Sequence, residues 1–472
     1  MKIEQIYTGC LAEAAYYIES NGEVAIIDPL RDVSPYIDRA NRNNGSIKYI
    51  FETHFHADFV SGHIDLAKKT GAKIVFGPTA APGYDAYIAK DEEVFPLGNV
   101  FIKALHTPGH TMESSCFLLL DENKKEVAVF TGDTLFIGDV GRPDLVQKVK
   151  ADVTPQILAA HLYNSLRTKL MVLPDDVIVY PGHGAGSACG KSMSKETTDT
   201  IGHQKQVNYA LEASLTVEKF TDKLLDGLVE PPQYFPANVI LNLKGSVKSV
   251  DDVVKAGTQA LSPSEFSTVW ESLNALVLDT RKKEAFSAAH IPGAVFIGLD
   301  DNFAPWVGTL IPDLNQAILL ITEEGREEEA VIRLSRVGYD NPVGFLKGGM
   351  EVWIAAGNKV EVLAQITPGD FERMFSGGSI EARDVRRKSE YDTEHIEGVE
   401  NFPLDFINKN LSSLNKEKTY YLHCQGGYRS VIACSILMSK GFSKVVNVLG
   451  GYKELAQTNL KRTQFHKQNT EL

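Results

Sequence analysis

Short apolar runs bounded by turn residues dominate the first 240 residues and predict strands that alternate with helices. Asn21-Gly22 separates two such runs, residues 15–20 and 23–28, and predicts a tight hairpin because both turn positions favour a positive φ. A helical pattern at residues 64–69 ends at Gly71, a residue type that commonly terminates helices. Further strands are predicted at residues 47–52, 73–76, 100–104, 116–120, 127–131 and 177–180. This part of the chain is therefore predicted to be one layered α/β unit.

The rest of the chain contains an internal repeat. Three blocks of a first copy recur in the same order in a second copy, at an offset of 105 and then of 102 residues. The matched blocks are Ser262-Pro263 with Thr367-Pro368, Asp279…His290 with Asp384…His395, and Gly348-Gly349 with Gly450-Gly451. Strand–helix alternation in each copy predicts a compact parallel α/β domain. We therefore expect three domains, at residues 1–240, 241–361 and 362–472.

Composition and charge narrow the possible functions. A chain of 472 residues has room for about three domains, and its 43% hydrophobic and 23% charged residues are typical of globular proteins. The formal net charge of −13 disfavours nucleic-acid or membrane partners. Glu4 and Glu13 interrupt the region where a secretory signal would be apolar, and no apolar stretch of about 18 residues follows. Five scattered cysteines argue against a disulfide framework, so we expect a cytoplasmic protein.

Four predicted strand ends carry histidine or aspartate. The side chains are His54, His56, Asp58, His110, Asp133 and His183. Imidazole and carboxylate are the ligands of zinc, iron and manganese sites. A lone histidine is more often a hydrogen-bonded core residue, but the spaced set favours a divalent-metal site. The spacing alone leaves open whether His56 is a fourth ligand.

This donor set resembles that of the metallo-β-lactamase fold, an αββα sandwich, over residues 1 to about 240. The fold usually holds two metals and has a further histidine directly after the motif aspartate, where this chain has Phe59. A phenyl ring cannot bind a metal, so a binuclear hydrolase becomes a weaker interpretation. What remains offers a face of two histidines and one carboxylate, which is typical of non-haem Fe(II) chemistry with O₂.

Within this fold the sequence resembles persulfide dioxygenases fused to rhodanese domains. The matching blocks are Thr53–Asp58, Thr107–Thr111, Gly132-Asp133 and Gly141–Asp144. The resemblance implies one Fe(II) per chain, bound by His54, His110 and Asp133. It places His56, Asp58 and His183 around those ligands.

Two more residues near this site are candidates for substrate binding. Arg142 resembles the substrate-positioning arginine of the family, because guanidinium binds carboxylate in a bidentate manner. The alternative for Arg142 is an ion pair with Asp144. Cys189 lies in a block of small residues that also resembles the fusion enzymes, and the neighbouring Lys191 would favour its thiolate. The alternative for Cys189 is a small packing residue.

The second copy of the repeat carries a candidate nucleophile. Cys424 ends the predicted strand 418–423 and opens a glycine-bearing loop into a predicted helix at 430–438. Backbone N–H groups of such a loop, together with Arg429, favour the thiolate, which can accept sulfane sulfur as a persulfide. This copy resembles a rhodanese domain, with four residues between Cys424 and Arg429. The residues between them, predicted to bind substrate, are Gln425, Gly426, Gly427 and Tyr428. Cys434 is assigned to the apolar face of the helix.

In the first copy Thr322 stands where Cys424 stands in the second. Glutamates at 323, 324 and 327–329 would repel an anion from this loop. The first copy is therefore predicted to have a rhodanese-like fold without rhodanese chemistry, and to serve as a spacer or an interface.

These observations predict a bifunctional enzyme with a metallo-β-lactamase αββα sandwich and two rhodanese-like parallel α/β domains. By resemblance, the iron domain oxidises a low-molecular-weight persulfide with O₂ to sulfite, and Cys424 transfers sulfane sulfur and gives thiosulfate. A glyoxalase II-like binuclear thioester hydrolase and a non-catalytic sulfur carrier or scaffold are the alternatives. We expect a homo-oligomer whose partners are the persulfide, O₂, and sulfite or thiosulfate.

Overall fold

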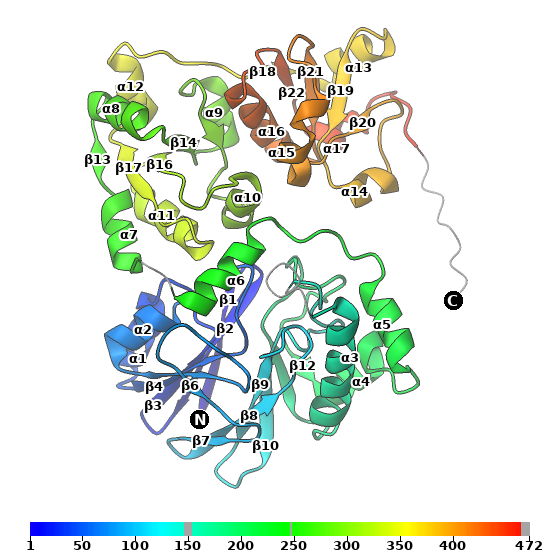
Figure 1. Ribbon diagram of the computed structural model, residues 1–472. Coiled ribbons are helices and arrows are strands. Elements are labelled where there is room, and N and C mark those ends of the chain that lie inside the picture. Colours follow the sequence, from blue (N-terminus) through cyan, green and yellow to red (C-terminus); the bar gives the residue numbers. More distant parts are fainter. Residues whose placement is uncertain (146–152, 246–247, 464–472) are drawn as a thin grey trace. The chain divides into compact units, whose positions relative to one another are not determined.

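The computed structural model describes residues 1–145, 153–245 and 248–463 of the chain (Figure 1). Contacts divide the chain into two compact units. Unit 1 comprises Met1–Asp252 together with Ile332–Asp340, and unit 2 comprises Val253–Val331 and Asn341–Leu472. The predicted first domain thus lies in unit 1, while the two predicted repeat domains fall mainly in unit 2.

Unit 1 contains two six-stranded sheets. In sheet order, the first consists of β1 (Lys2–Thr8), β2 (Glu13–Ser20), β3 (Glu23–Ile27), β4 (Ser46–Glu52), β5 (Lys73–Phe76) and β6 (Tyr87–Ile88). The second consists of β12 (Asp199–Thr200), β11 (Ile178–Pro181), β10 (Glu126–Gly132), β9 (Ser115–Leu120), β8 (Val100–His106) and β7 (Val94–Leu97). The strands predicted from the sequence are all present.

Helices cover the outer faces of the two sheets. The inner faces meet in one apolar core that includes Tyr16, Phe51, Phe117 and Phe130. Two further cores join each sheet to its helices. The helices of unit 1 are α1 (Ser34–Arg42), α2 (His63–Thr70), α3 (Pro155–Ser165), α4 (Ile201–Val207), α5 (Val217–Leu225) and α6 (Phe235–Lys244), with short turns η2 (Leu166–Leu170) and η3 (Tyr209–Leu211). This arrangement is the helix–sheet–sheet–helix sandwich predicted from the family resemblance.

Two local predictions in unit 1 are confirmed by backbone angles. Asn21 and Gly22 join β2 to β3 with φ of 49° and 78°, the positive values that a two-residue hairpin turn requires. Helix α2 ends at Gly71, whose φ is 73°. Strands β3 and β4 run parallel, as do β10 and β11, so the residues that follow each pair emerge at one edge of their sheet.

Unit 2 contains two five-stranded parallel sheets with the same strand order. The first consists of β13 (Ala260–Leu261), β17 (Pro342–Leu346), β16 (Ile318–Ile321), β14 (Leu276–Asp279) and β15 (Val295–Phe296). The second consists of β18 (Ala364–Ile366), β22 (Val445–Val448), β21 (Tyr420–His423), β19 (Glu381–Asp384) and β20 (Glu400–Asn401). Equivalent strands such as β14 and β19 begin 105 residues apart, which confirms the repeat.

The helices repeat in the same way. The first copy has α8 (Pro263–Leu273), α9 (Lys283–Ala288), α10 (Phe303–Leu310), α11 (Glu327–Arg336) and α12 (Gly349–Ala355), preceded by α7 (Val250–Gly257). The second has α13 (Pro368–Ser376), α14 (Lys388–Thr393), α15 (Ile407–Asn410), α16 (Tyr428–Ser439) and α17 (Gly451–Leu455), with turns η4 (Leu404–Phe406) and η5 (Leu411–Ser413). Ser262 and Thr367 cap α8 and α13 through their hydroxyl groups, which explains the first matched block.

The second matched block of the repeat, Asp279…His290 with Asp384…His395, makes the same hydrogen bonds in both copies. Asp279 and Asp384 are buried, and each binds the guanidinium of the arginine two residues later. His290 and His395 each contact, through Nδ1, the backbone carbonyl four residues earlier. The same contacts in both copies indicate that these residues stabilise the domain fold.

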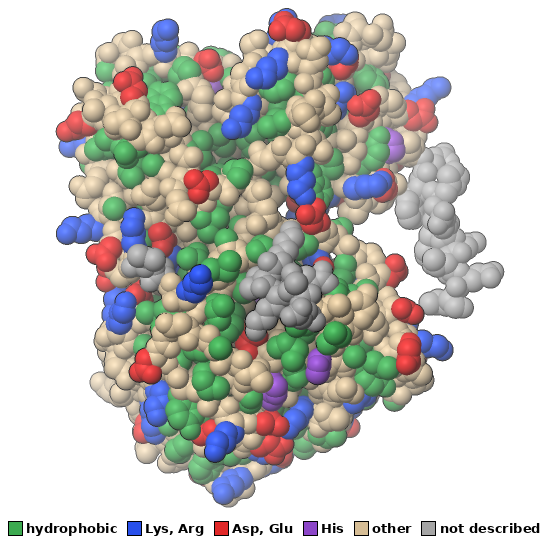
Figure 2. Space-filling view, viewed as in Figure 1, with side chains coloured by type: hydrophobic (Ala, Val, Ile, Leu, Met, Phe, Trp, Pro, Cys, Tyr) green, Lys and Arg blue, Asp and Glu red, His purple; other side chains and the backbone are tan. Residues whose placement is uncertain are grey.

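Surface charge is mixed on the face shown in Figure 2, where acidic and basic side chains are scattered among one another. Across the described ranges, no helix combines the length and the apolar character that crossing a bilayer requires.

The third matched block, Gly348-Gly349 with Gly450-Gly451, allows a close backbone contact in the second copy only. Gly349 and Gly451 begin α12 and α17 with φ of 60° and 61°. A Cβ atom on Gly451 would lie 2.3 Å from the carbonyl oxygen of Cys424, whereas no described atom beyond the adjoining residues and the nearby backbone of α12 comes within 4 Å of one on Gly349. The glycine pair of the second copy therefore lets α17 lie directly against the Cys424 loop.

Gly451→Ala should destabilise unit 2 more than Gly349→Ala. Alanine is strained at either site by about 1–2 kcal/mol because φ is positive. The clash with Cys424 should add roughly 1–3 kcal/mol at Gly451 alone. Denaturant unfolding of the two variants measures the difference in the free energy of unfolding, and equal losses would contradict the close contact.

Candidate metal centre and cysteine loop

Three buried donors meet at the strand ends of unit 1. His54 follows β4, His110 lies in the loop between β8 and β9, and Asp133 follows β10 directly. Their donor atoms lie within 4.8 Å of one another. Asp133 Oδ2 is 3.9 Å from His54 Nε2 and 3.5 Å from His110 Nε2. Two ligands that are each about 2.0–2.2 Å from one ion lie roughly 3–4 Å apart, so this set fits a divalent metal.

Hydrogen bonds fix which atoms of the two histidines face the metal position. The Thr53 hydroxyl donates to Asp28 Oδ2 at 2.8 Å, so it accepts from His54 Nδ1, which lies 2.9 Å away. His110 Nδ1 donates to the backbone carbonyl of Arg142 at 2.8 Å. Each ring therefore carries its proton on Nδ1 and leaves the Nε2 lone pair for a metal.

His183 orients the carboxylate ligand. Its Nδ1 lies 2.7 Å from Asp133 Oδ1, and its Nε2 lies 2.7 Å from Asp58 Oδ2. Both ring nitrogens are therefore bound to carboxylates. Asp133 Oδ2 has no hydrogen-bond partner among the described residues although it is buried, which is the condition expected of a metal-binding oxygen.

The directions of the pKa shifts in this cluster are consistent with metal binding by His54, His110 and Asp133. Burial lowers the pKa of His54 and His110, which favours the neutral form that binds metal. Burial would raise the pKa of Asp133, but His183, His110 and His54 outweigh it and hold that pKa far below its ordinary value. Burial also opposes the charged form of His183, yet Asp133 and Asp58 raise its pKa well above the usual range.

His56 points to a different set of carboxylates. Its Nε2 lies 3.2 Å from Asp28 Oδ1 and 3.6 Å from Glu52 Oε2. Phe59 stacks on the ring with centroids 4.2 Å apart. Burial opposes a charged ring, but Asp28 and Glu52 raise the pKa of His56 to about 9. His56 is thus not part of the three-donor group, and the phenyl ring at Phe59 packs against it.

The guanidinium of Arg142 is already bound to protein groups. It forms a bidentate pair with Asp144 at 2.6 and 2.7 Å and donates to the carbonyls of Ala188 and Val229. Its side chain is buried. The ion pair that the sequence left open is therefore present, and Arg142 serves the metal site through the carbonyl that accepts from His110.

Cys189 lies close to the same cluster. Its sulfur, a carboxylate oxygen of Asp58 and a nitrogen of His183 lie within 4.8 Å of one another. Burial and the charges of Asp58 and Asp133 raise the pKa of Cys189. The Lys191 ammonium instead donates to the carbonyls of Lys223 and Asp226. Lys191 therefore does not favour a Cys189 thiolate in this structure, because its ammonium group faces other residues.

Cys424 is buried between β21 and α16, at the position predicted from the sequence. The amide of Gly427 donates to its sulfur at 3.1 Å. The amide of Tyr452 donates to the Cys424 carbonyl at 2.6 Å, which ties the loop to α17. Gln425 and Gly426 are exposed, so the loop is open to small molecules at these residues.

The cations of this loop are paired. Arg429 forms a bidentate contact with Glu390 at 2.6 and 2.8 Å. Arg386 binds Asp384 in the same manner and lies over the Tyr452 ring. The charge that Arg429 was expected to lend to Cys424 is thus largely balanced. Cys434 is fully buried within α16, consistent with packing.

The equivalent loop of the first copy is different. Thr322 follows β16 and is buried, and the acidic residues Glu327, Glu328 and Glu329 occupy the first turn of α11. Arg326 pairs with Glu329 and Asp300. A loop without a thiol and with this charge cannot perform the chemistry proposed for Cys424.

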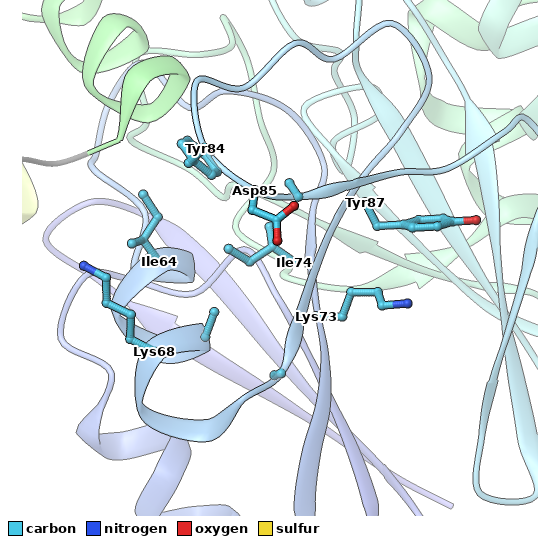
Figure 3. Close-up of a pocket in the computed structure, with 10 residues that line it drawn as sticks. Ile64, Lys68, Lys73, Ile74, Tyr84, Asp85 and Tyr87 are labelled. Atoms are coloured by element: carbon cyan, nitrogen blue, oxygen red, sulfur yellow. The ribbon is translucent and has the colours of Figure 1, made fainter.

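A surface cavity of about 510 Å³ lies elsewhere in unit 1 (Figure 3). Residues of α2, β5 and the segment before β6 line it, including Ile64, Lys68, Lys73 and Tyr84. None of the predicted site residues lines this cavity, so it is separate from the metal centre.

The sequence did not single out Asp28, and it predicted for Arg142 a different role from the one that its backbone carbonyl has in the structure. Asp28 accepts from the Thr53 amide at 2.8 Å as well as from its hydroxyl, and this fixes the start of the His54 loop. A signal was available, because Asp28 follows a predicted strand in the way that Asp133 follows another. The carbonyl role of Arg142 left no signal in the sequence.

His183→Asn should weaken metal binding by about 10- to 100-fold, because Asp133 would lose the partner that orients it. The matched control is His203→Asn. His203 Nδ1 also contacts a carboxylate, that of Asp199 at 2.6 Å, but its side chain is 57% exposed and it does not belong to the three-donor group. Competition with a chelator measures the affinity of both variants. Equal affinities would contradict the orienting role of His183.

Known protein families match both the N-terminal and the C-terminal part of the chain. The model of the metallo-beta-lactamase superfamily matches residues 8–183, and the model of the rhodanese-like domain matches residues 262–356 and 367–458. The family matches thus cover both the metal centre and the Cys424 loop.

Curated relatives cover the N-terminal part. A probable hydroxyacylglutathione hydrolase of Schizosaccharomyces pombe is 33% identical over 195 residues, 40% of this chain and 71% of the relative. A hydroxyacylglutathione hydrolase of Rhizobium etli is 35% identical over 166 residues, 34% of this chain and 57% of the relative. The chain thus spans little more than half the length of the second relative.

Solved structures extend the similarity. A metallo-beta-lactamase from Staphylococcus aureus is 32% identical, with a TM-score of 0.64, and the match covers 73% of this chain and 98% of that one. ETHE1 from Myxococcus xanthus is 26% identical, with a TM-score of 0.44, over 51% of this chain and 98% of that one. The chain therefore belongs to the metallo-β-lactamase superfamily, and its metallo-β-lactamase domain is followed by two rhodanese-like domains.

Proposed function

We propose that this metalloenzyme is a persulfide dioxygenase joined to a sulfurtransferase. The observation that carries the proposal is the three-donor face of His54, His110 and Asp133. Two imidazoles and one carboxylate are typical of non-haem Fe(II) enzymes that use O₂. The nearby His183 and His56 are engaged with carboxylates, which favours one metal over two. The sequence resemblance to persulfide dioxygenases supports the same choice.

In the proposed reaction a low-molecular-weight persulfide, RSSH, combines with O₂ and water to give RSH, sulfite and two protons. Bound Fe(II) supplies the redox chemistry and open positions for both reactants. His54 and His110 would hold the metal through Nε2, and Asp133 would hold it through Oδ2. His183 keeps the carboxylate ionised and correctly turned. The side chains of His54, His110 and Asp133 are all buried.

Cys424 performs the second proposed reaction. Its sulfur bonds to the terminal sulfur of another persulfide, the RS–S bond breaks, and RSH leaves. Sulfite then attacks the outer sulfur on Cys424, which releases the cysteine and forms thiosulfate. The amide of Gly427 stabilises the anionic sulfur in both steps. Neither step needs an external oxidant or reductant.

The proposal places the protein in the cytoplasm as a homo-oligomer, without nucleic-acid or membrane partners. The five cysteines are free, which is typical of a reducing compartment.

A glyoxalase II-like thioester hydrolase is the second candidate. The names of the hydroxyacylglutathione hydrolase relatives favour it, as does the second donor group of Asp58, His183 and Cys189. Phe59 disfavours it, because the ring packs on His56 where a metal-binding histidine would be needed. The two candidates differ in metal content and in the bond that they cleave.

Asp133→Ala should abolish persulfide-dependent O₂ uptake, because the carboxylate ligand is lost. Sulfur uptake by Cys424 should persist, since that thiol lies in unit 2. An oxygen electrode measures the first property, and mass spectrometry of the Cys424 persulfide measures the second. Sustained O₂ uptake in this variant would refute the ligand assignment.

Cys424→Ser should leave O₂ uptake largely unchanged and shift the product from thiosulfate to sulfite. Cys434→Ser is the matched control, because Cys434 is buried in the adjoining helix and is assigned to packing. Ion chromatography of the products measures the ratio. An unchanged thiosulfate yield in the Cys424 variant would place the transfer at another thiol.

A further inference from the structure

The helix that follows the Cys424 loop is enclosed within unit 2. Residues 430–437 of α16 are all buried, although a helix on one face of a sheet usually leaves a stripe exposed. The first copy of the repeat covers the remaining side. The amide of Phe296, in β15, donates to the hydroxyl of Ser435 at 2.9 Å. The copy without a thiol therefore contacts the element that carries the reactive loop.

The contact reaches the start of the helix. The Tyr428 hydroxyl donates to the carbonyl of Gly298 at 3.1 Å, and the Tyr428 ring meets the Phe296 ring edge-on with centroids 5.8 Å apart. Tyr428 lies four residues after Cys424. The first copy is thus held in a fixed register beside the loop.

A lysine of the first copy lies at the edge of the same loop. Lys283 begins α9, and its Cε lies about 4.0 Å from the position that a Cβ on Gly427 would take. The amide of Gly427 is the group that donates to the sulfur of Cys424. The ammonium group, one bond beyond Cε, is therefore carried close to the rim of the loop.

The partners of Lys283 are weak compared with those of the neighbouring arginines. Its Nζ lies 3.4 Å from Glu284 Oε1, and the two side chains are 38% and 73% exposed. Asp301 also faces Lys283, and burial raises the pKa of Asp301 while the lysine opposes that effect. Exposed ion pairs contribute little, so an incoming anion can replace Glu284. Arg429 and Arg386, in contrast, are held by bidentate carboxylates.

We propose that Lys283 binds the doubly charged sulfur oxyanion, sulfite or thiosulfate, that exchanges sulfur with Cys424. This inference rests on the proposed sulfurtransferase function and assigns its anion specificity to the copy that lacks a thiol. In the transfer, the sulfur of sulfite bonds to the outer sulfur of the Cys424 persulfide while the bond to the cysteine breaks. Lys283 touches the oxygen atoms only, and takes no part in the bond exchange.

The test compares Lys283→Ala and Lys283→Arg with Lys282→Ala, a neighbouring exposed lysine that serves as the matched control. Sulfur transfer to cyanide is measured with thiosulfate and with the persulfide of an uncharged thiol as donors. Lys283→Ala should raise the KM for thiosulfate by about three- to tenfold and leave kcat within about twofold. Its KM for that persulfide should not change, because the persulfide has no sulfur-bound oxygen atoms for Lys283 to contact. The KM and kcat of Lys283→Arg should stay close to those of the unchanged protein, because arginine keeps the positive charge.

A second variant should act in the opposite direction. Glu284→Gln removes the carboxylate that competes for Lys283, so the KM for thiosulfate should fall by about twofold. The inference is overturned if Lys283→Ala behaves like Lys282→Ala, or if both donors are affected equally. Cys424→Ser distinguishes a failure of the Lys283 proposal from a failure of the proposed sulfurtransferase function. Retained transfer activity in Cys424→Ser defeats the sulfurtransferase proposal itself, whereas lost activity with unaltered Lys283→Ala kinetics defeats only the role of the lysine.

Discussion

The metal centre depends on one buried interaction, the imidazole of His183 held between Asp133 and Asp58. A buried carboxylate is costly unless it is paired, and a metal ligand must be both ionised and turned toward the ion. The single contact to Asp133 Oδ1 meets both requirements and leaves Oδ2 free. Asp28 and the Arg142 carbonyl do the same for the two histidine ligands, so each donor is fixed by a group that does not itself face the metal.

Much of this arrangement could be predicted from the sequence. Strand ends that carry histidine or aspartate indicated which residues would meet, and the offsets of 105 and 102 residues indicated two domains of one topology. The Asn21-Gly22 turn and the Gly71 helix end were predictable because positive φ limits the residue type. These features depend on backbone geometry, which leaves a clear pattern in the chain.

Side-chain direction was harder to predict, for a physical reason. Arg142 pairs with Asp144, two residues away, and also donates to the carbonyl of Val229, whereas the Lys191 ammonium donates to the carbonyls of Lys223 and Asp226 and not toward Cys189. Spacing places a residue on an element, whereas burial and competing carboxylates decide where a charged group points. The same limit explains why the sequence left the position of His56 open, while the structure turns it toward Asp28.

Metal analysis of the purified chain, combined with oxygen uptake after addition of a persulfide, tests the central claim most directly. We expect about one iron per chain, O₂ consumption that depends on the persulfide, and no cleavage of thioesters. A pair of zinc ions with thioester hydrolysis and no response to persulfides would contradict it.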